Sequence, residues 1–428
     1  MSKRRLAAFS VIALFAAASA SAATVPPAAT FSDADDELIA LGRGIPGFGG
    51  MFVDAEGALH VWMLDPDAGG AVDKALSGLA RPTDPAGESV RLHRGDFTFE
   101  RLVAWKRTLT PVLSLPGVLS LDADEARNRV TIGIVHGMAP ADRERLEAAL
   151  AAGDVPSRAV AFREGEPFKA LPLAVNANAI DAKASPSIAT LTDKIRPVPG
   201  GMQVAFGCSN IACFVCTDGF TAIRGKTLGF VTNSHCTGER GTVDSTRYSQ
   251  STPSGGIVGT EIVDPPHFAC GVGRRCRFSD AAFVKFDKKS FGSLARIAKP
   301  FNNGTDFALT LMTPATSRFV VSGAGPSPRT GDILHKVGRT TGWTYGPVTG
   351  TCVEVSVSGT DITYSCQTLV TAGADGGDSG SPVFSWGGGK TAQLQGLLWG
   401  GGDFDGQRVY AFSSLGQIQQ ELGALKIK

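Results

Sequence analysis

Hydrophobic and polar positions follow two different patterns along this chain of 428 residues. The region from about 40 to 168 has mixed local signals, which predict a small α+β domain. Its predicted elements are a hairpin over 51–63, a helix with Leu102, Trp105, Leu109 and Leu113 near one face, a strand pair over 118–121 and 130–135, and a helix from Pro140 to Ala152 that Gly153 closes.

After Gly200 the chain consists of short β-rich runs broken by glycines, which predict an all-β barrel or sandwich. The runs are Phe214–Ile223, Leu228–Thr232, Ala281–Phe286, Val348–Val357, Leu394–Trp399 and Val409–Phe412. Between the two regions, from about 170 to 200, the chain is rich in Ala, Asn, Ser, Pro and Thr and has no period. We therefore expect an exposed linker there, the kind of segment in which proteolytic cutting concentrates.

Composition supports a globular protein with more than one domain. Apolar residues make up 43% of the chain and charged residues 19%, with a formal net charge of +1. Both signs are spread along the chain, so neither nucleic acid nor a strongly acidic partner is indicated. The 53 glycines agree with many tight turns.

The first 22 residues have the pattern of a secretory signal peptide. Lys3 to Arg5 precede the apolar run Leu6–Ala18, and small residues follow through Ala20-Ser21-Ala22. A retained membrane anchor is the alternative, but the run is shorter than the ~20 apolar residues that a spanning helix needs. We expect a secreted protein, extracellular or periplasmic, with no membrane partner.

All eight cysteines lie between Cys208 and Cys366. An even number in an exported chain indicates disulfides. The Cys213–Cys216 pair has CxxC spacing but lacks a second pair at zinc-like spacing, so we expect no metal and no cofactor.

Three short blocks in the β-rich part contain the residue types of nucleophilic catalysis. A serine hydroxyl needs a neutral imidazole to take its proton, a carboxylate to orient that imidazole, and backbone N–H groups for the developing oxyanion. The β-rich part holds three histidines, His235, His267 and His335. His235 follows an apolar strand in GFVTNSHCT, Asp280 opens a strand in FSDAAFV, and Ser379 lies in DGGDSGSPV. Each block alone also fits a turn, a cap or a buried residue without function.

Together the blocks resemble the three triad motifs of the trypsin/chymotrypsin clan, in that clan's His–Asp–Ser order and with suitable spacing of 45 and 99 residues. The segment GRTTGWT from Gly338 resembles the bacterial streptogrisin and α-lytic protease branch. The resemblance covers Gly200 to the C-terminus and extends more loosely to the first region. It implies a double six-stranded antiparallel β-barrel preceded by a small α+β pro-domain.

The resemblance also implies roles for individual residues. Ser379 is expected as the nucleophile, His235 as general base and then acid, and Asp280 as the orienting carboxylate. The backbone N–H groups of Gly377 and Ser379 are expected to form the oxyanion hole. The expected substrate pocket includes Gly373, Asp375, Trp399 and Gly400, although core packing would also explain Trp399.

Three departures from the clan's pattern concern the pocket region. Asp375 stands where a cysteine is common, Leu398 where a serine is common, and Ser381 where a second glycine is common. The position near the floor of the expected substrate pocket is Gly373, so the sequence shows no acidic side chain at that floor. We expect an apolar or small side chain before the scissile bond, unless Asp375 reaches into the pocket.

The same resemblance implies that Cys216 and Cys236 form the disulfide of the histidine loop. We pair Cys270–Cys276 and Cys352–Cys366 as local hairpin links, which leaves Cys208–Cys213, although eight cysteines allow 105 pairings. Asp378, next to the nucleophile, is expected to be buried and to need a cation. Lys336 fits that position in the bacterial branch, with Arg339 as a substitute.

The sequence thus predicts a signal peptide over 1–22, a pro-region over 23–168, a linker with the processing site over 169–200, and a protease domain over 201–428. The cut is expected between about Ala182 and Gly200. The predicted product is a secreted serine endopeptidase, expected to be a monomer, that acts on proteins or peptides. Its own pro-region would assist folding and block the cleft, because folds rich in non-local contacts fold slowly. A retained binding module is the alternative for the first region.

Other classes of protein remain as alternatives. One is a catalytically inactive homologue that acts as a secreted binding protein, and another is a β-sandwich adhesion or lectin-like module. The G-x-S-x-G elbow of α/β-hydrolases is not met, because Ser381 stands where the last glycine is needed.

Overall fold

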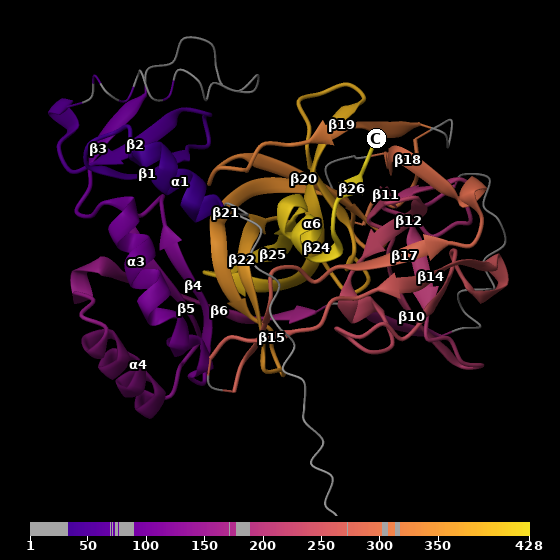
Figure 1. Ribbon diagram of the computed structural model, residues 1–428, viewed down its shortest axis with the longest axis horizontal. Coiled ribbons are helices and arrows are strands. Elements are labelled where there is room, and N and C mark those ends of the chain that lie inside the picture. Colours follow the sequence, from indigo (N-terminus) through magenta and orange to yellow (C-terminus); the bar gives the residue numbers. More distant parts are fainter. Residues whose placement is uncertain are drawn as a thin grey trace, which may run out of the picture. The chain divides into compact units, whose positions relative to one another are not determined.

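The computed structural model in Figure 1 describes residues 33–68, 70, 72, 76, 90–170, 172–176, 189–271, 273–301, 307–312 and 317–428. The expected signal peptide over 1–22 lies outside the described residues, as does the middle of the expected linker. None of the helices in these ranges is long and apolar enough to span a membrane.

The first region is the predicted α+β domain. Its elements are α1 (Ala34–Gly42), β1 (Phe48–Val53), β2 (Leu59–Met63), β3 (Arg91–Arg94), α3 (Phe99–Leu109), β4 (Val118–Asp124), β5 (Arg129–Val135), α4 (Pro140–Ala152) and β6 (Val160–Ala170). The predicted hairpin β1–β2, strand pair β4–β5 and helix α4 are confirmed. The predicted helix with Leu113 on its face is shorter than expected, because α3 ends at Leu109 and Leu113 lies in a 3₁₀ segment, Thr110–Ser114. α1, β3 and β6 were not predicted.

Local sequence explains where the two longer helices begin. The Thr98 side chain caps α3 by accepting a hydrogen bond from the Arg101 N–H, and Pro140 occupies the first turn of α4. Both helices direct buried apolar side chains, such as Leu102 and Leu146, into one core with the strands. Beyond α4 the chain returns as β6, parallel to β5.

The second region is built almost entirely of strands. They are β8 (Val198–Gly200), β9 (Gln203–Phe206), β10 (Ala212–Thr217), β11 (Phe220–Arg224), β12 (Thr227–Thr232), β13 (Arg247–Ser249), β14 (Ile257–Val263), β15 (Phe268–Ala269), β16 (Arg275–Arg277), β17 (Ala282–Phe286), β18 (Gly292–Ala298), β19 (Arg318–Ala324), β20 (Ile333–Gly338), β21 (Gly342–Ser356), β22 (Ile362–Thr371), β23 (Pro382–Ser385), β24 (Thr391–Phe404), β25 (Gln407–Ser414) and β26 (Leu425–Lys426). The described part of this region also contains the α-helix α6 (Leu415–Leu422) and short 3₁₀ helices such as Ser234–Cys236.

These strands form two barrels, as expected. The second is a closed antiparallel ring of six in the order β20-β21-β22-β25-β24-β23, with β23 returning to β20. The first has the antiparallel order β11-β12-β17-β14-β13-β9-β10. These are seven strands, one more than expected. The described sheet has nine strands in all, because β26 pairs with β11 at one end and β7 (Leu173–Asn176) with β10 at the other.

The segment expected as an exposed linker differs from that expectation in its described parts. Within 169–200, β7 pairs with β10 and β8 with β18, while Leu191 and Val198 are fully buried. Strands of three or four residues are held to a sheet by backbone hydrogen bonds and are too short to show a hydrophobic period in the sequence. The sequence therefore contained no sign of β7 or β8.

The first region joins the second barrel by strand pairing at two places. Leu121 of β4 pairs with Glu354 of β21, and Ala170 of β6 pairs with Gly400 of β24. β4, β5 and β6 therefore continue the sheet of the second barrel (Figure 1).

Candidate active site

The side chains of His235, Asp280 and Ser379 come from three separate blocks of the sequence and meet in the structure. Nε2 of His235 lies 2.8 Å from Oγ of Ser379, and Nδ1 of His235 is hydrogen-bonded to Oδ2 of Asp280. An ionised carboxylate only accepts hydrogen bonds, so Nδ1 carries the proton and Nε2 is left to accept one from the serine hydroxyl. This is the arrangement that a nucleophilic serine requires.

Backbone contacts hold the histidine turn against Asp280. β12 ends at Thr232, and the N–H of Ser234 and Nδ2 of Asn233 both donate to the carbonyl oxygen of Asp280, at 3.1 and 2.8 Å. The N–H of His235 donates to Oδ1 of the Asp280 carboxylate at 3.2 Å. The imidazole and the carboxylate are thus positioned by the same short turn.

The serine loop depends on two glycines with positive φ angles. Gly377 has φ +94° and Gly380 has φ +90°. A Cβ at Gly380 would lie 2.1 Å from the carbonyl oxygen of Thr217, and one at Gly377 would lie 2.6 Å from Cδ of Arg339. Side chains are therefore excluded at both positions. Among the described residues, the N–H groups of Gly377 and Ser379 have no hydrogen-bond acceptor.

Burial and charge set the ionisation states in the triad. Burial lowers the pKa of His235 below its ordinary value of 6.5, against the opposing effect of the Asp280 carboxylate. Burial also acts to raise the pKa of Asp280, but the charge and hydrogen bond of His235 outweigh it, so the pKa of Asp280 lies well below its usual range. At neutral pH the imidazole is therefore neutral and the carboxylate ionised.

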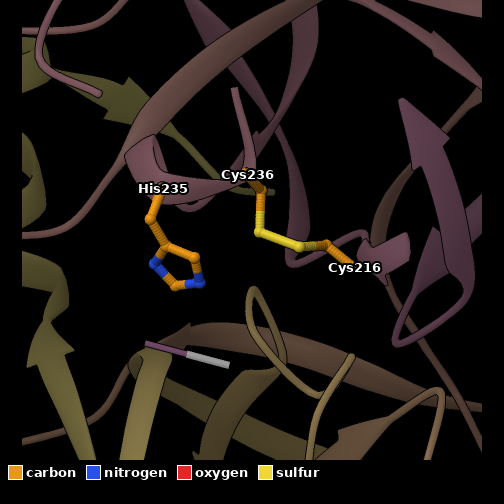
Figure 2. A group of neighbouring side chains, drawn as sticks. All are labelled: Cys216, His235 and Cys236. Atoms are coloured by element: carbon orange, nitrogen blue, oxygen red, sulfur yellow. A yellow bond between two sulfur atoms is a disulfide. The ribbon is translucent and has the colours of Figure 1, made fainter. Parts of the chain in front are cut away.

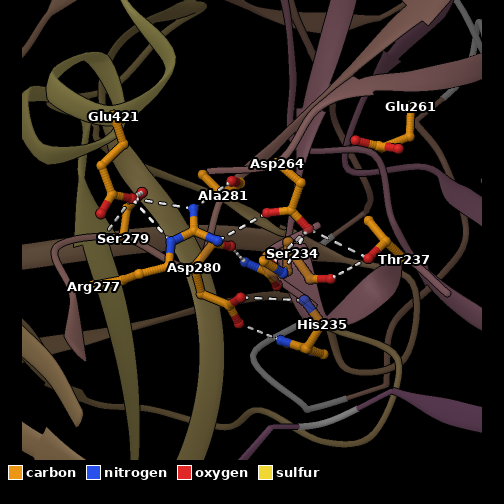
Figure 3. A network of polar contacts seen from close by, with 12 residues as sticks. Ser234, His235, Thr237, Glu261, Asp264, Arg277, Ser279, Asp280, Ala281 and Glu421 are labelled. Carbon is orange, nitrogen blue, oxygen red and sulfur yellow. Dashed lines mark hydrogen bonds and ion pairs between the residues drawn. The ribbon is translucent and has the colours of Figure 1, made fainter. Parts of the chain in front are cut away.

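A network of buried charged side chains, which the sequence did not predict, lies next to the turn that carries His235 (Figure 3). Arg277 is fully buried and donates to Oδ1 of Asp264 at 2.8 Å, to the carbonyl oxygen of Ala281 at 2.8 Å and to Glu421 at 3.1 Å. Oδ2 of Asp264 accepts from Oγ of Ser234 at 2.8 Å. The guanidinium thus connects the histidine turn to the strand that follows Asp280.

The sequence offered little signal for this network. Arg277 lies three residues before Asp280, but Asp264 and Glu421 are 13 and 144 residues from Arg277. In the sequence Arg277 lies close to Arg274 and Arg275, and nothing in this basic block indicates which arginine is buried.

The expected partner of Asp378 is Lys336. Its Nζ lies 3.0 Å from Oδ2 of Asp378, and both side chains are fully buried. Oγ1 of Thr341 donates to the same carboxylate at 2.6 Å. Arg339, the expected substitute, donates instead to Oε1 of Gln203 at 2.8 Å.

Each of the four residues expected in the substrate pocket has a different structural environment. Trp399 is fully buried, and its Nε1 donates to Gln367 at 2.9 Å, so its side chain belongs to the core. The exposed Asp375 accepts from the N–H of Gly376 at 2.7 Å, within its own loop. The carbonyl oxygen of Gly373 accepts from Oγ1 of Thr344 at 2.8 Å. A Cβ at Gly400 would lie 2.7 Å from the carbonyl oxygen of Lys169 in β6.

The eight cysteines form the disulfides Cys208–Cys213, Cys216–Cys236, Cys270–Cys276 and Cys352–Cys366. Cys216, His235 and Cys236 lie close enough together to suggest a metal site (Figure 2). Because the two sulfurs are bonded to each other and both ring nitrogens of His235 are engaged, these atoms are not free to bind a metal. The Cys216–Cys236 disulfide instead ties β10 to the histidine turn.

Two β-barrels, with the side chains of Ser379, His235 and Asp280 in hydrogen-bonding contact, are the arrangement of the chymotrypsin-like fold. Neither a protein-family model nor a curated protein sequence matches the chain. Matching solved structures include protease A of Thermobifida fusca (23% identity, TM-score 0.38), the chymotrypsin of Cellulomonas bogoriensis (24%, 0.37) and a Nocardiopsis protease (22%, 0.38). Each match covers 54% of this chain and 97 to 98% of the other.

Proposed function

We propose that this chain is the precursor of a secreted serine endopeptidase that hydrolyses peptide bonds through an acyl-enzyme. The observation that carries the proposal is the Nε2–Oγ distance of 2.8 Å between His235 and Ser379, with Asp280 on the other ring nitrogen. The alternative of an inactive homologue has less support, because no member of the triad is missing or displaced.

The triad geometry supports a definite sequence of proton transfers. Oγ of Ser379 attacks the carbonyl carbon of the scissile bond while Nε2 of His235 takes the hydroxyl proton. Asp280 stabilises the imidazolium, and the N–H groups of Gly377 and Ser379 receive the oxyanion. His235 then gives its proton to the leaving amine, which leaves an ester on Ser379. Water then attacks the ester while Nε2 of His235 takes its proton, and His235 returns that proton to Oγ of Ser379 as the acid product leaves.

The N-terminal domain would keep the precursor inactive. Ala170 and Lys169 of β6 pair with Gly400 and Gly401 of β24. The nearby Leu398 of β24 accepts a hydrogen bond from the N–H of Gly380, next to the nucleophile, at 2.9 Å. The end of β6 thus occupies the strand edge on which the acyl side of a substrate would lie.

The chain then continues to the other side of the serine. Leu173 in β7 pairs with Val215 of β10, and the N–H of Thr217 at the end of β10 donates to the carbonyl oxygen of Ser379 at 2.7 Å. We infer that the first cut falls between Ala170 and Leu173. This position lies N-terminal to the expected range of Ala182 to Gly200.

Hydrolysis of a peptide amide by the processed enzyme tests the proposal. The Asp280→Asn variant keeps the shape of the site but favours the wrong tautomer of His235, so we expect kcat to fall by ~10⁴. A matched control is Asp361→Asn, because Asp361 is an exposed aspartate whose partner is Arg275. Equal rates in all three proteins would refute the proposed mechanism. N-terminal sequencing of the exported product identifies the cut.

A further inference from the structure

The backbone N–H of Asp280 has its hydrogen-bond partner on the second barrel. Asp280 lies between β16 and β17, and its N–H donates to Oγ of Ser413, in β25, at 3.2 Å. The Ser413 hydroxyl donates in turn to Oε1 of Gln367, in β22, at 2.9 Å. Ser413 and Gln367 are 1% and 0% exposed. A buried chain of hydrogen bonds thus runs from the core of the second barrel to the residue whose carboxylate holds His235.

Further hydrogen bonds fix the orientation of the Gln367 amide. Its Oε1 also accepts from Nε1 of Trp399 at 2.9 Å. Its Nε2 donates to the carbonyl oxygens of Phe278 and Ser365, at 2.9 and 2.7 Å. Because an indole N–H only donates and a carbonyl oxygen only accepts, the amide cannot turn over without losing these contacts. The amide oxygen therefore faces Ser413.

This orientation decides the direction of the Ser413 hydroxyl. A hydroxyl has one hydrogen, and here that hydrogen is directed to Oε1 of Gln367. The lone pairs of Oγ then face the N–H of Asp280 and accept from it. Gln367 also holds the carbonyl oxygen of Phe278, two residues before Asp280. One buried side chain therefore fixes this segment both directly and through Ser413.

The carboxylate of Asp280 depends on the position of this backbone. Its Oδ1 accepts from the N–H of His235 at 3.2 Å, and its Oδ2 is hydrogen-bonded to Nδ1 of the same histidine. An aspartate side chain is short, so a shift of the Asp280 backbone moves the carboxylate relative to the imidazole. A misplacement of ~1 Å in a catalytic site can cost ~10² in rate.

From these contacts we propose that Gln367 is a positioning residue for catalysis, which acts through Ser413 and Phe278 to hold Asp280 against His235. The core of the second barrel thereby sets the position of the carboxylate that orients the imidazole. This inference rests on the proposed endopeptidase function.

Steady-state kinetics of the processed enzyme on a neutral peptide amide test the inference. Ser413→Ala removes one oxygen atom and the link to Asp280, and Gln367→Met removes the amide at similar volume. The same barrel offers a matched pair of controls, because Gln395 is also buried and its Nε2 donates to Oγ of Ser385 at 3.4 Å. We expect kcat to fall about tenfold in Ser413→Ala and Gln367→Met, with KM changed less than about twofold. In Ser385→Ala and Gln395→Met, kcat should change by less than about twofold.

The pH profile separates positioning from a loss of stability. The Asp280 carboxylate acts to raise the pKa of His235, against burial and the positive charge of Arg240. A displaced carboxylate raises that pKa less, so the acid limb of kcat/KM should move to lower pH by about half a pH unit in Ser413→Ala. A change that only lowers stability reduces the amount of folded enzyme and leaves the midpoint of this limb unchanged. The midpoint should therefore stay constant in both controls.

The double variant Gln367→Met/Ser413→Ala shows whether the two residues act in series. It should be no slower than Gln367→Met alone, because both changes act on the same N–H. Multiplied effects would mean that Gln367 does not act through Ser413, which would refute the inference. If Gln367→Met does not fold, Ser413→Ala decides alone, because it removes a single oxygen atom.

The outcomes also separate the inference from the proposed function. Absence of hydrolysis by the parent enzyme would refute the proposed function, and the inference with it. Normal hydrolysis by the parent enzyme, with an unchanged kcat and acid limb in Ser413→Ala or with equal losses in Ser413→Ala and Ser385→Ala, would refute the inference alone.

Discussion

Nζ of Lys336 lies 3.0 Å from Oδ2 of Asp378, one residue before Ser379, and neither side chain is exposed to solvent. Burial alone would raise the pKa of Asp378, but the charge of Lys336 keeps that pKa below its ordinary value. Asp378 also accepts from the N–H of Thr340 at 2.9 Å. The serine loop is therefore held in place by a side chain on β20.

Removal of the cation should leave a buried charge without compensation. We expect Lys336→Met to lower the free energy of unfolding by about 3–5 kcal/mol, measured by urea denaturation of precursors that carry Ser379→Ala to prevent cleavage. The exposed Lys289 offers a control, and Lys289→Met should change the free energy by less than about 0.5 kcal/mol. The double variant Lys336→Met/Asp378→Asn should recover part of the loss. Equal stability of the parent and Lys336→Met would contradict this role.

Arg277 should act as a positioning residue for the histidine turn. A lysine cannot reproduce the fork that bonds Asp264, Ala281 and Glu421, so Arg277→Lys is expected to destabilise the precursor by about 2–4 kcal/mol. In the processed enzyme it should lower kcat more than it raises KM. The neighbouring exposed pair Arg275–Asp361 gives the control, for which Arg275→Lys should cost less than about 1 kcal/mol. Equal losses in both variants would argue against this role for Arg277.

The pH dependence of hydrolysis should report His235. The active form needs a neutral imidazole, so kcat/KM rises with pH through the pKa of His235 and is lost below it. Because burial lowers that pKa, the acid limb should have its midpoint below 6.5. A pH–rate profile on a neutral peptide substrate provides the measurement. A midpoint above 6.5 would mean that stabilisation of the imidazolium by Asp280 outweighs burial.

Precursor stability should fall with rising pH because of Glu125. Burial raises the pKa of this carboxyl to about 8, although Thr330 and Thr351 donate to it, and the neighbouring Asp122 also has a raised pKa. When folding raises the pKa of a carboxyl, the stability that this group contributes is complete below its pKa in the unfolded chain, 4.5. That contribution is lost as the pH rises through its pKa in the folded protein. The Ser379→Ala precursor should therefore be about 3 kcal/mol less stable at pH 9 than at pH 6 from this group.

The Glu125→Gln variant should flatten this pH dependence, and the exposed Glu144→Gln should leave it unchanged. Urea unfolding at both pH values measures the difference. An unchanged slope in Glu125→Gln would assign the effect to another buried carboxyl, such as Asp122, whose pKa burial raises well above its ordinary value.

The local motifs of this chain could be recognised in the sequence because the residues of each motif are consecutive. His235, Asp280 and Ser379 each lie in a block that combines a strand end, a turn and a reactive side chain, and the structure brings the three together. The helices α3 and α4 follow from apolar spacing and end signals in the same way. The catalytic roles of the triad remain proposals.

Contacts that depend on distant partners could not be predicted. β7 shows no hydrophobic period over four residues, and the apolar cluster that receives it is formed by β9 and β10. Glu421 reaches Arg277 from α6 near the C-terminus, and nothing near either residue indicates the other. From sequence Trp399 fitted a pocket or the core equally, and its full burial and its hydrogen bond to Gln367 assign it to the core.

Reaction of the processed enzyme with a fluorophosphonate, followed by mass-spectrometric mapping of the adduct, tests the central claim most directly. A fluorophosphonate modifies a serine whose hydroxyl is activated by a neighbouring imidazole and whose oxyanion is stabilised. The account predicts one adduct, on Ser379, and its loss in His235→Ala. Failure to label Ser379 in a folded, processed protein would contradict the account and favour a binding protein.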